Sequence, residues 1–388
     1  MFTANRVDGI REGFFPAGGA GGNAMPQASV GNIRRRKQIM KKGFVASVLL
    51  FSAIALLTIG VTVSSAGDKA PKLTGTAYVA GHGGHLAVLN LATGEIDRIF
   101  VTKAGGELAG QIAGLTLSAE KEAGGGTHGA AQVGRNLYVG MLNGKVIKVN
   151  LDKDNELTDL GQVGKKFCGA VPGPGGNIYY EDMADGNVYV FDPAKEKAAD
   201  VITGFGGMSV CGIGWDKGDK HAFISDMVQG KVFVLDWATK KPIKTIENVG
   251  TFLHQGRTNP DQTEFWVTAA NEFTVGPKGP EPNAVAGKGK SEVVIIDMKD
   301  MSVKSRIDVT EDGAFPHDLA FTPDGKYALV TARTYGDDSV MLTIDTKTHE
   351  VVNETSLCKG CHEAAGVKVT IDNNSPLLCG ITVDWAAK

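Results

Sequence analysis

The sequence lacks an excess of charge of either sign, and this excludes one large class of function. Its 40 lysines and arginines nearly balance its 43 aspartates and glutamates, for a formal net charge of −3. Chains that bind nucleic acid normally carry a basic surface patch. We therefore expect no nucleic-acid partner, and function must be sought in particular residues.

Proline is also sparse, with 14 residues, whereas glycine is abundant, with 52. Because 42% of the residues are hydrophobic, the composition is not that of a disordered chain. It suits many short strands joined by tight turns. The 388 residues are enough for one large all-β domain or two ordinary ones.

The N-terminal region is typical of an export signal. Residues 1–39 are interpreted as a disordered or mis-assigned extension, since Met40 would begin a more ordinary signal. Residues 40–66 combine lysines, a long uncharged apolar run and a small-residue cleavage site, which predicts a secretory signal peptide. The apolar run is long enough to span a bilayer, so an uncleaved signal is the only membrane contact that we expect. The protein is therefore predicted to be periplasmic or otherwise exported.

Residues 67–388 contain an internal repeat. Its clearest element is a short apolar strand that ends in Asp or Asn. Six copies occur, at residues 86–90, 146–150, 188–192, 232–236, 293–297 and 341–345. Three of the five spacings between their last residues are 42, 44 and 48 residues, and the two longer spacings contain insertions. Four strands in such a period are typical of a β-propeller blade.

The repeat predicts an all-β fold with a single β-propeller, in which six repeats are visible. The C-terminal strands expected at 367–371 and 377–385 have no complete blade of their own. We expect them to complete the blade begun by residues 75–101, so that the N- and C-terminal strands close the ring.

A histidine or cysteine opens the innermost strand of each repeat in this interpretation. The six residues are His128, Cys168, Cys211, His254, His317 and His362, out of only eight histidines and five cysteines in the chain. Innermost strands all start on one rim of the channel, so these side chains should converge there. Imidazole and thiolate are common ligands of transition metals and haem iron, and imidazole is also a proton donor. For Cys168 and Cys211, an ordinary buried role or a disulfide between blades is the favoured interpretation.

Cys358, Cys361 and His362 form a C-x-x-C-H motif, which in an exported protein indicates covalent c-type haem. No methionine lies beyond Met341 and only 26 residues follow His362, so a separate cytochrome c domain with its own second ligand does not fit there. The alternative is a disulfide among Cys358, Cys361 and Cys379. Five cysteines leave one odd thiol if only disulfides form.

The blade starts resemble the d1-haem propeller of cytochrome cd1 nitrite reductases. The stretches that carry the resemblance are residues 252–256, 268–271, 294–300, 307–309 and 316–317. The repeat as a whole also resembles the wider propeller family named for its Tyr-Val-Thr-Asn motif. The cytochrome d1 resemblance implies seven blades, a d1-like haem, His128 as an iron ligand, and His254 and His317 as a catalytic pair that donates protons. His362 is the second predicted metal ligand. The late C-x-x-C-H motif and the lack of an N-terminal cytochrome c domain depart from that family.

These features together predict a periplasmic haem-binding propeller in redox chemistry or electron transfer on small nitrogen compounds. Its partners would be a nitrogen-oxide-type substrate or a redox cytochrome. If it is an enzyme, it is an oxidoreductase that resembles nitrite reductase. Two alternatives stay open: a non-catalytic propeller subunit of a multihaem complex similar to hydrazine synthase, and a carrier or biogenesis protein for d1 haem.

Overall fold

The structure is a computed structural model that describes only part of the chain: residues 71–81, 85–102, 108–112, 127–153, 156–271, 273–274, 285–286, 290–310, 315–333, 339–357 and 380–386. All of them belong to the compact unit Asp68–Lys388. The predicted extension at 1–39 and the signal peptide at 40–66 lie outside the described residues. Within the described ranges, no helix has the length and apolar character needed to cross a membrane.

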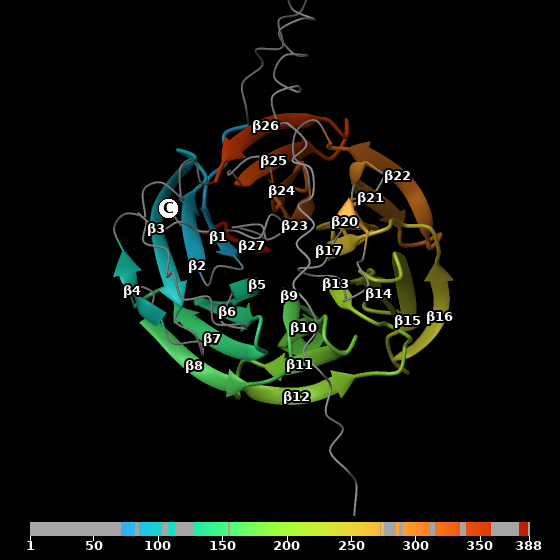
Figure 1. The fold of residues 1–388 in the computed structure, drawn as a ribbon, viewed down its shortest axis with the longest axis horizontal. Helices are drawn as coiled ribbons and strands as arrows, with labels where there is room; N and C mark the ends of the chain where they lie inside the picture. The colour runs from blue at the N-terminus through green and yellow to red at the C-terminus, as the bar shows by residue number, and fades with distance from the viewer. Residues whose placement is uncertain are drawn as a thin grey trace, which may run out of the picture. The chain divides into compact units, whose positions relative to one another are not determined.

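The described strands form six sheets arranged as blades around a central axis (Figure 1). From the axis outward, blade 1 consists of β27 (Gly380–Asp384), β1 (Thr76–Gly81), β2 (His85–Asn90) and β3 (Glu95–Thr102), with β4 (Leu108–Ile112) beyond them. Blade 2 consists of β5 (Thr127–Val133), β6 (Asn136–Met141), β7 (Lys145–Asn150) and β8 (Glu156–Gln162). Blade 3 consists of β9 (Phe167–Pro172), β10 (Ile178–Asp182), β11 (Val188–Asp192) and β12 (Lys197–Ile202).

The other three blades follow the same order. Blade 4 consists of β13 (Val210–Trp215), β14 (His221–Asp226), β15 (Lys231–Asp236) and β16 (Lys241–Ile246). Blade 5 consists of β17 (Leu253–Thr258), β18 (Glu264–Ala270), β21 (Ser291–Asp297) and β22 (Ser302–Asp308). Blade 6 consists of β23 (Pro316–Phe321), β24 (Tyr327–Arg333), β25 (Ser339–Asp345) and β26 (Val351–Ser356). A short 3₁₀ helix, η1 (Pro174–Gly176), and a two-stranded hairpin of β19 (Phe273–Thr274) and β20 (Val285–Ala286) complete the described elements.

The ring closes as predicted for residues 377–385, whereas the strand predicted at 367–371 lies outside the described residues. β27 pairs antiparallel with β1, from Thr76 opposite Asp384 to Ala80 opposite Gly380, so the last strand completes the blade that the first strands begin. The ring closes with six blades, and apart from the β19–β20 hairpin the described residues form no further sheet. The number of repeats visible in the sequence was therefore the better guide than the seven blades that the resemblance implies.

The six strands that end in Asp or Asn are all the third strand of their blade. Their terminal side chain caps the turn that follows. Asp236, for example, accepts a hydrogen bond from the backbone N–H of Thr239 at 2.8 Å, and Asp297 accepts one from Lys299 at 2.9 Å. Such short side chains favour turns because they bind the backbone two or three residues on. The repeat thus marks where each third strand stops.

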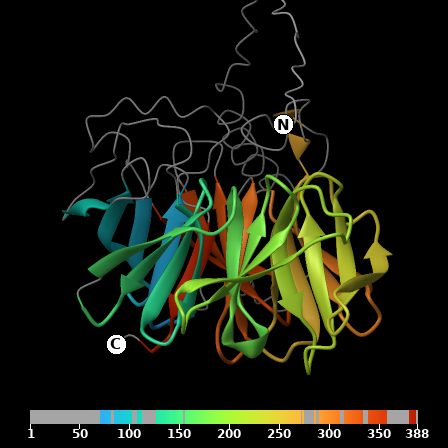
Figure 2. The same cartoon turned by 90° about the horizontal axis from the view of Figure 1, so that it is seen from below.

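The apolar core lies between neighbouring blades rather than in one central cluster. Six separate clusters each join two adjacent blades. Between blades 3 and 4, the ring centroids of Tyr179 and Trp215 lie 4.7 Å apart, and those of Tyr179 and Trp237 lie 5.5 Å apart. Each blade is therefore held by the faces of its two neighbours, as they stand side by side around the axis (Figure 2).

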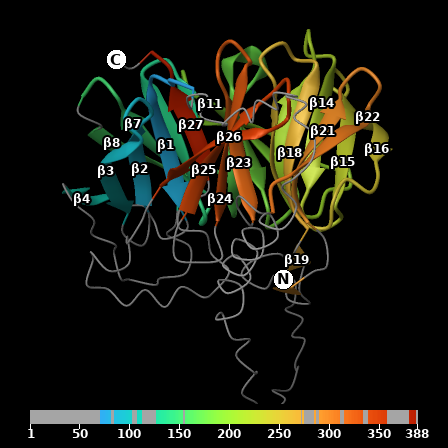
Figure 3. The same cartoon turned by 90° about the horizontal axis from the view of Figure 1, so that it is seen from above.

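The innermost strands begin at one face of the ring, which we call the mouth face. In blade 5, Leu253 at the start of β17 pairs with Ala269 near the end of β18. The β19 strand that follows β18 accordingly projects from this face (Figure 3). The innermost strands end at the opposite face, which we call the far face.

Candidate functional site

Five of the predicted rim residues share one structural position. His128, Cys168, Cys211, His254 and His317 are each the second residue of the innermost strand in blades 2 to 6. All five side chains are buried. The structure therefore brings these residues to one end of the channel, at the mouth face.

A β-bulge occurs at every one of these positions. In blade 4, Val210 pairs with Asp226 and Ile213 with Ile224, so that Cys211 and Gly212 together oppose the single residue Ser225. The same two-against-one register occurs in blades 5 and 6, and in blades 2 and 3 one extra residue is inserted, at His128 and at Cys168. Bulges bend a strand and re-aim a side chain, and they are common beside functional sites.

Hydroxyl groups opposite the bulges tie blade 4 to blade 5 and blade 5 to blade 6. Ser225 of blade 4 donates to the carbonyl oxygen of His254 in blade 5 at 3.1 Å. Thr268 of blade 5 donates to the carbonyl oxygen of His317 in blade 6 at 2.7 Å. The backbones of His254 and His317 are thus each held by a neighbouring blade, which restricts where their imidazoles can lie.

The three imidazoles lie against one another. The ring centroid of His254 is 3.7 Å from that of His317 and 6.2 Å from that of His128, and the His128 and His317 centroids are 4.9 Å apart. Nδ1 of His128 also contacts the carbonyl oxygen of Cys168. The convergence of these histidines, from strands that are far apart in the chain, agrees with the prediction from the repeat.

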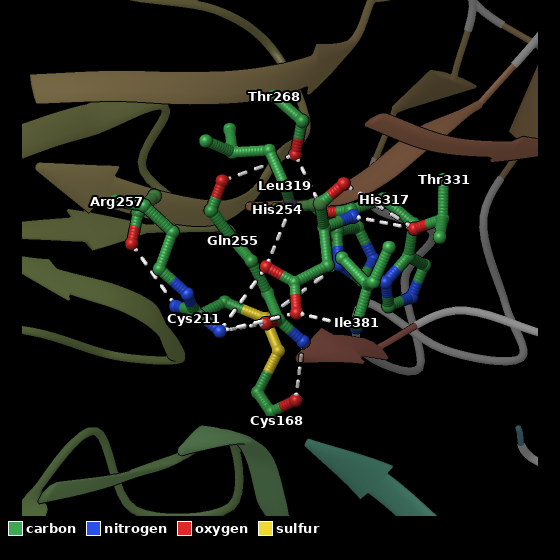
Figure 4. A network of polar contacts seen from close by, with 12 residues as sticks. Cys168, Cys211, His254, Gln255, Arg257, Thr268, His317, Leu319, Thr331 and Ile381 are labelled. Carbon is green, nitrogen blue, oxygen red and sulfur yellow. Dashed lines mark hydrogen bonds and ion pairs between the residues drawn. A yellow bond between two sulfur atoms is a disulfide. The ribbon is translucent and has the colours of Figure 1, made fainter. Parts of the chain in front are cut away.

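Cys168 and Cys211 are joined by a disulfide between blades 3 and 4 (Figure 4). Their Cα atoms are 5.2 Å apart, and the Sγ atom of Cys211 lies 3.7 Å from Nδ1 of His254. Of the interpretations left open by the sequence for these cysteines, the disulfide between blades is the one that the structure shows.

The sixth predicted rim residue, His362, does not open the innermost strand of blade 1. That strand is β27, which begins at Gly380. The prediction that His362 opens an innermost strand is therefore wrong. Cys358, Cys361 and His362 lie outside the described residues, so their role as haem ligands stays a prediction.

A second polar layer, which the sequence analysis missed, fills the channel below the imidazoles (Figure 4). Gln255 donates to the carbonyl oxygen of Cys168 at 2.7 Å, and Arg257 donates to Oε1 of Gln255 at 2.6 Å. Arg257 also pairs with Asp318 at 3.1 Å and with Glu181 at 3.7 Å. Both carboxylates are fully buried, so one guanidinium balances two acidic groups.

Burial shifts the proton affinity of this layer. It raises the pKa of Glu181 from 4.5 to about 7, although the nearby Arg257 opposes the shift. It also raises the pKa of Asp318, again against the attraction of Arg257. Desolvation disfavours the charged form of a carboxyl group. Glu181 is therefore protonated for part of the time near neutral pH.

The described geometry does not fit a tetrapyrrole held between His128 and the pair of His254 and His317. The three rings are fully buried, and the 4.9 Å between the His128 and His317 centroids is filled by the rings themselves. A flat macrocycle could enter there only if the innermost strands separated. Any haem at this end of the channel must lie outside the imidazole cluster.

A separate cleft of about 600 Å³ lies at the far face, where β9, β13 and β17 end. Trp215, Arg257 and Pro260 are among its lining residues. Arg257 thus extends from the wall of this cleft to the buried carboxylates, and the mouth-face cluster is a different site.

Comparison with known proteins shows the fold alone. No protein-family model matches the sequence, and no curated protein matches it. Among solved structures, the chain is similar to dihydro-heme d1 dehydrogenase NirN in complex with DHE, with 14% identity and a TM-score of 0.43 over 74% of this chain and 66% of that one. It is also similar to Kuenenia stuttgartiensis hydrazine synthase, with 17% identity and a TM-score of 0.45 over 81% of this chain and 88% of that one. A third similar structure is a chain of a mitotic checkpoint complex, with 12% identity and a TM-score of 0.45 over 67% of this chain and 70% of that one. The β-propeller fold itself rests on the strand pairing described above.

Proposed function

We propose that this chain is an exported, haem-bearing propeller that takes part in redox chemistry of small nitrogen compounds. In this proposal, haem is attached through Cys358 and Cys361, and His362 is an iron ligand. The haem would supply the electron-transfer chemistry.

The main support is the position of the two described ends that flank the C-x-x-C-H segment. Strand pairing aligns Pro316 with Ala332 and Val340 with Ser356, so β26 ends at the mouth face, where β23 begins. At the other end, a Cβ atom on Gly380 would overlap the carbonyl oxygen of His128. Both Leu357 and Gly380, which bracket the segment, therefore lie at the mouth face.

In the proposed function, His254 and His317 donate protons to a small oxyanion reduced at this end of the channel. Their rings are in contact, and imidazole is the side chain that most often serves as a general acid. Glu181, with its pKa raised to about 7, lies in the polar layer beneath and would return protons to them.

Haem attachment is tested with the exported full-length protein. A pyridine haemochrome spectrum and a mass increase of one haem on the intact chain are expected. Both should be lost when Cys358 and Cys361 are replaced by Ser, whereas replacement of Cys168 by Ser should leave the mass increase unchanged. A wild-type protein without covalent haem would contradict the proposed attachment.

Turnover is tested with nitrite and a reduced viologen dye. His254→Ala and His317→Ala should lower the rate about 100-fold while the haem spectrum is kept, because general acid groups contribute about that much. His221→Ala, at the far-face end of β14 in blade 4, is the matched control. A haem spectrum without any turnover would favour the carrier alternative, and a colourless protein would favour the partner-subunit alternative.

A further inference from the structure

Three potential metal ligands from three consecutive blades meet at the mouth face. The Sγ atoms of Cys168 and Cys211 and a ring nitrogen of His254 all lie within 4.8 Å of one another. Each belongs to the bulged second residue of an innermost strand, so the backbone directs all three side chains to one point. We propose that, when the disulfide is reduced, Cys168, Cys211 and His254 hold one zinc ion, so that the same two sulfurs alternate between a cross-link and a metal site.

The change from the disulfide to the zinc-bound form needs only a small movement of the two cysteine side chains. Two thiolates on one tetrahedral zinc ion lie about 3.8 Å apart, as follows from Zn–S distances of about 2.3 Å. The Cα atoms of Cys168 and Cys211 are 5.2 Å apart, and this separation accommodates either arrangement by rotation of the side chains. The backbone carbonyl of His254 stays bound to Ser225 in blade 4, which keeps the third ligand in place.

The surroundings favour a divalent ion. Met183, Met227, Phe252 and Phe315 pack with the two cysteines in one buried apolar cluster. Two thiolates without compensation would be costly to bury there. One Zn²⁺ cancels their charge, and a set of two sulfurs and one imidazole nitrogen suits this ion. Three protein ligands leave the fourth position to water, as in catalytic zinc sites.

The chemistry balances with a dithiol as the reductant. The disulfide accepts two electrons and two protons and becomes two thiols, while the dithiol is oxidised to its own disulfide. Zinc then displaces the two thiol protons to solvent as it binds. This inference does not rest on the proposed haem attachment, because it uses none of Cys358, Cys361 or Cys379.

The test separates these cysteines from the other three. The full-length chain with Cys358, Cys361 and Cys379 replaced by Ser is reduced anaerobically with dithiothreitol, freed of it, and titrated with Co²⁺ and then Zn²⁺. One equivalent of Co²⁺ should bind with thiolate-to-cobalt charge-transfer absorption, and Zn²⁺ should displace it. The oxidised protein should bind neither. The wild-type chain, treated in the same way, should show the same extra equivalent only after reduction.

Variants and a second measurement keep the inference open to refutation. His254→Ala should lower zinc affinity at least about 100-fold, since loss of even an outer partner of a metal ligand costs 10- to 100-fold. The control His221→Ala should bind as the parent does. Circular dichroism monitors folding, and Zn²⁺ should raise the Tm of the reduced protein only. X-ray absorption should count two sulfur neighbours. A folded, reduced protein that binds no Co²⁺, or a bound ion without sulfur neighbours, would overturn the inference.

Discussion

At the scale of the residue, Glu181 has the most unusual environment. Its side chain comes from β10 and is fully buried, and its carboxylate packs so closely on Gly169 that a Cβ atom there would overlap it. The nearby positive charge is Arg257, at 3.7 Å. A carboxyl group in such a position is neutral over part of the physiological pH range, which links the stability of the fold to pH.

We expect this link to be visible in unfolding experiments. Because burial raises the pKa of Glu181 to about 7 in the folded state, the folded protein keeps a proton that the unfolded chain releases above pH 4.5. Stability is therefore highest below pH 4.5 as far as this group is concerned, and it falls as pH rises to about 7, by about 3 kcal/mol. Glu181→Gln should remove this contribution, measured as the difference between variant and wild-type urea unfolding from pH 4.5 to 8. The exposed Glu350→Gln is the control, and a pH-independent difference for Glu181→Gln would refute the assignment.

Arg257 is expected to be the charged residue of the channel whose replacement lowers the stability of the fold most. Arg257→Met leaves Glu181 and Asp318 buried without their cation, and breaking a buried pair in this way typically costs about 3–5 kcal/mol. The loss should be large at pH 8 and smaller at pH 5, where Glu181 is protonated in the folded state. Urea unfolding at the two pH values measures it. Lys304→Met, which removes a half-exposed partner of Glu264, should cost less than about 1 kcal/mol and serves as the control.

At the scale of the element, the innermost strands are closer together than side chains allow. The residue after the histidine or cysteine is glycine in blades 2, 3 and 4, at Gly129, Gly169 and Gly212. A Cβ atom on Gly129 would overlap the backbone of Gly169, and one on Gly212 would overlap the backbone nitrogen of Gly256. Glycine is thus required here by close approach of neighbouring strands, and this approach brings the imidazoles and sulfurs together.

Gly212→Ala should therefore destabilise the protein by about 3 kcal/mol, at the upper end of the cost of overpacking. The new methyl group meets Ser225 Oγ as well as the Gly256 backbone. A Gly212→Ala/Ser225→Ala double variant relieves only the side-chain contact and should regain little stability. If the double variant unfolds like Ser225→Ala alone, then the neighbouring strand is not the limiting contact. Thermal unfolding of the three variants decides between these outcomes.

The same elements show how far the sequence could lead. The apolar segments ending in Asp or Asn correctly predicted the third strand of each blade, because the capped turn that follows is local in the chain. The histidines and cysteines predicted at the rim marked the start of the innermost strand in five of the six blades. The sixth was missed because β27 begins at Gly380 rather than at His362, although Cys379-Gly380-Ile381 repeats the order of Cys211-Gly212-Ile213. The polar layer was missed because Gln255 meets Cys168 across 87 positions of sequence, and such a partner cannot be read from local pattern.

At the scale of the whole molecule, the six blades depend on one another through the closure of the ring. β27 pairs with β1, and its Ile381 packs with Ala77 and Leu89 in the cluster that joins blades 6 and 1. Its backbone also reaches the channel, since the N–H of Ile381 donates to Asp318 at 2.9 Å. Asp384, at the end of β27, pairs with Arg135 of blade 2. One short strand therefore connects both neighbouring blades and the polar layer of the site.

Deletion of residues 380–388 should therefore open the ring rather than trim its end. Without β27, the edge of β1 is unpaired, and unpaired edges recruit other chains. We expect the truncated chain to lose about 4 kcal/mol, with a Tm lower by about 10 °C for a domain of this size, and to form oligomers. Scanning calorimetry and light scattering after size exclusion measure the two effects. Deletion of residues 387–388 alone is the matched control and should leave a protein with the wild-type size and the wild-type Tm. If the longer deletion also keeps the wild-type size and Tm, then β27 does not close the ring, and the pairing that positions Gly380 beside His128 is not what maintains the mouth of the channel.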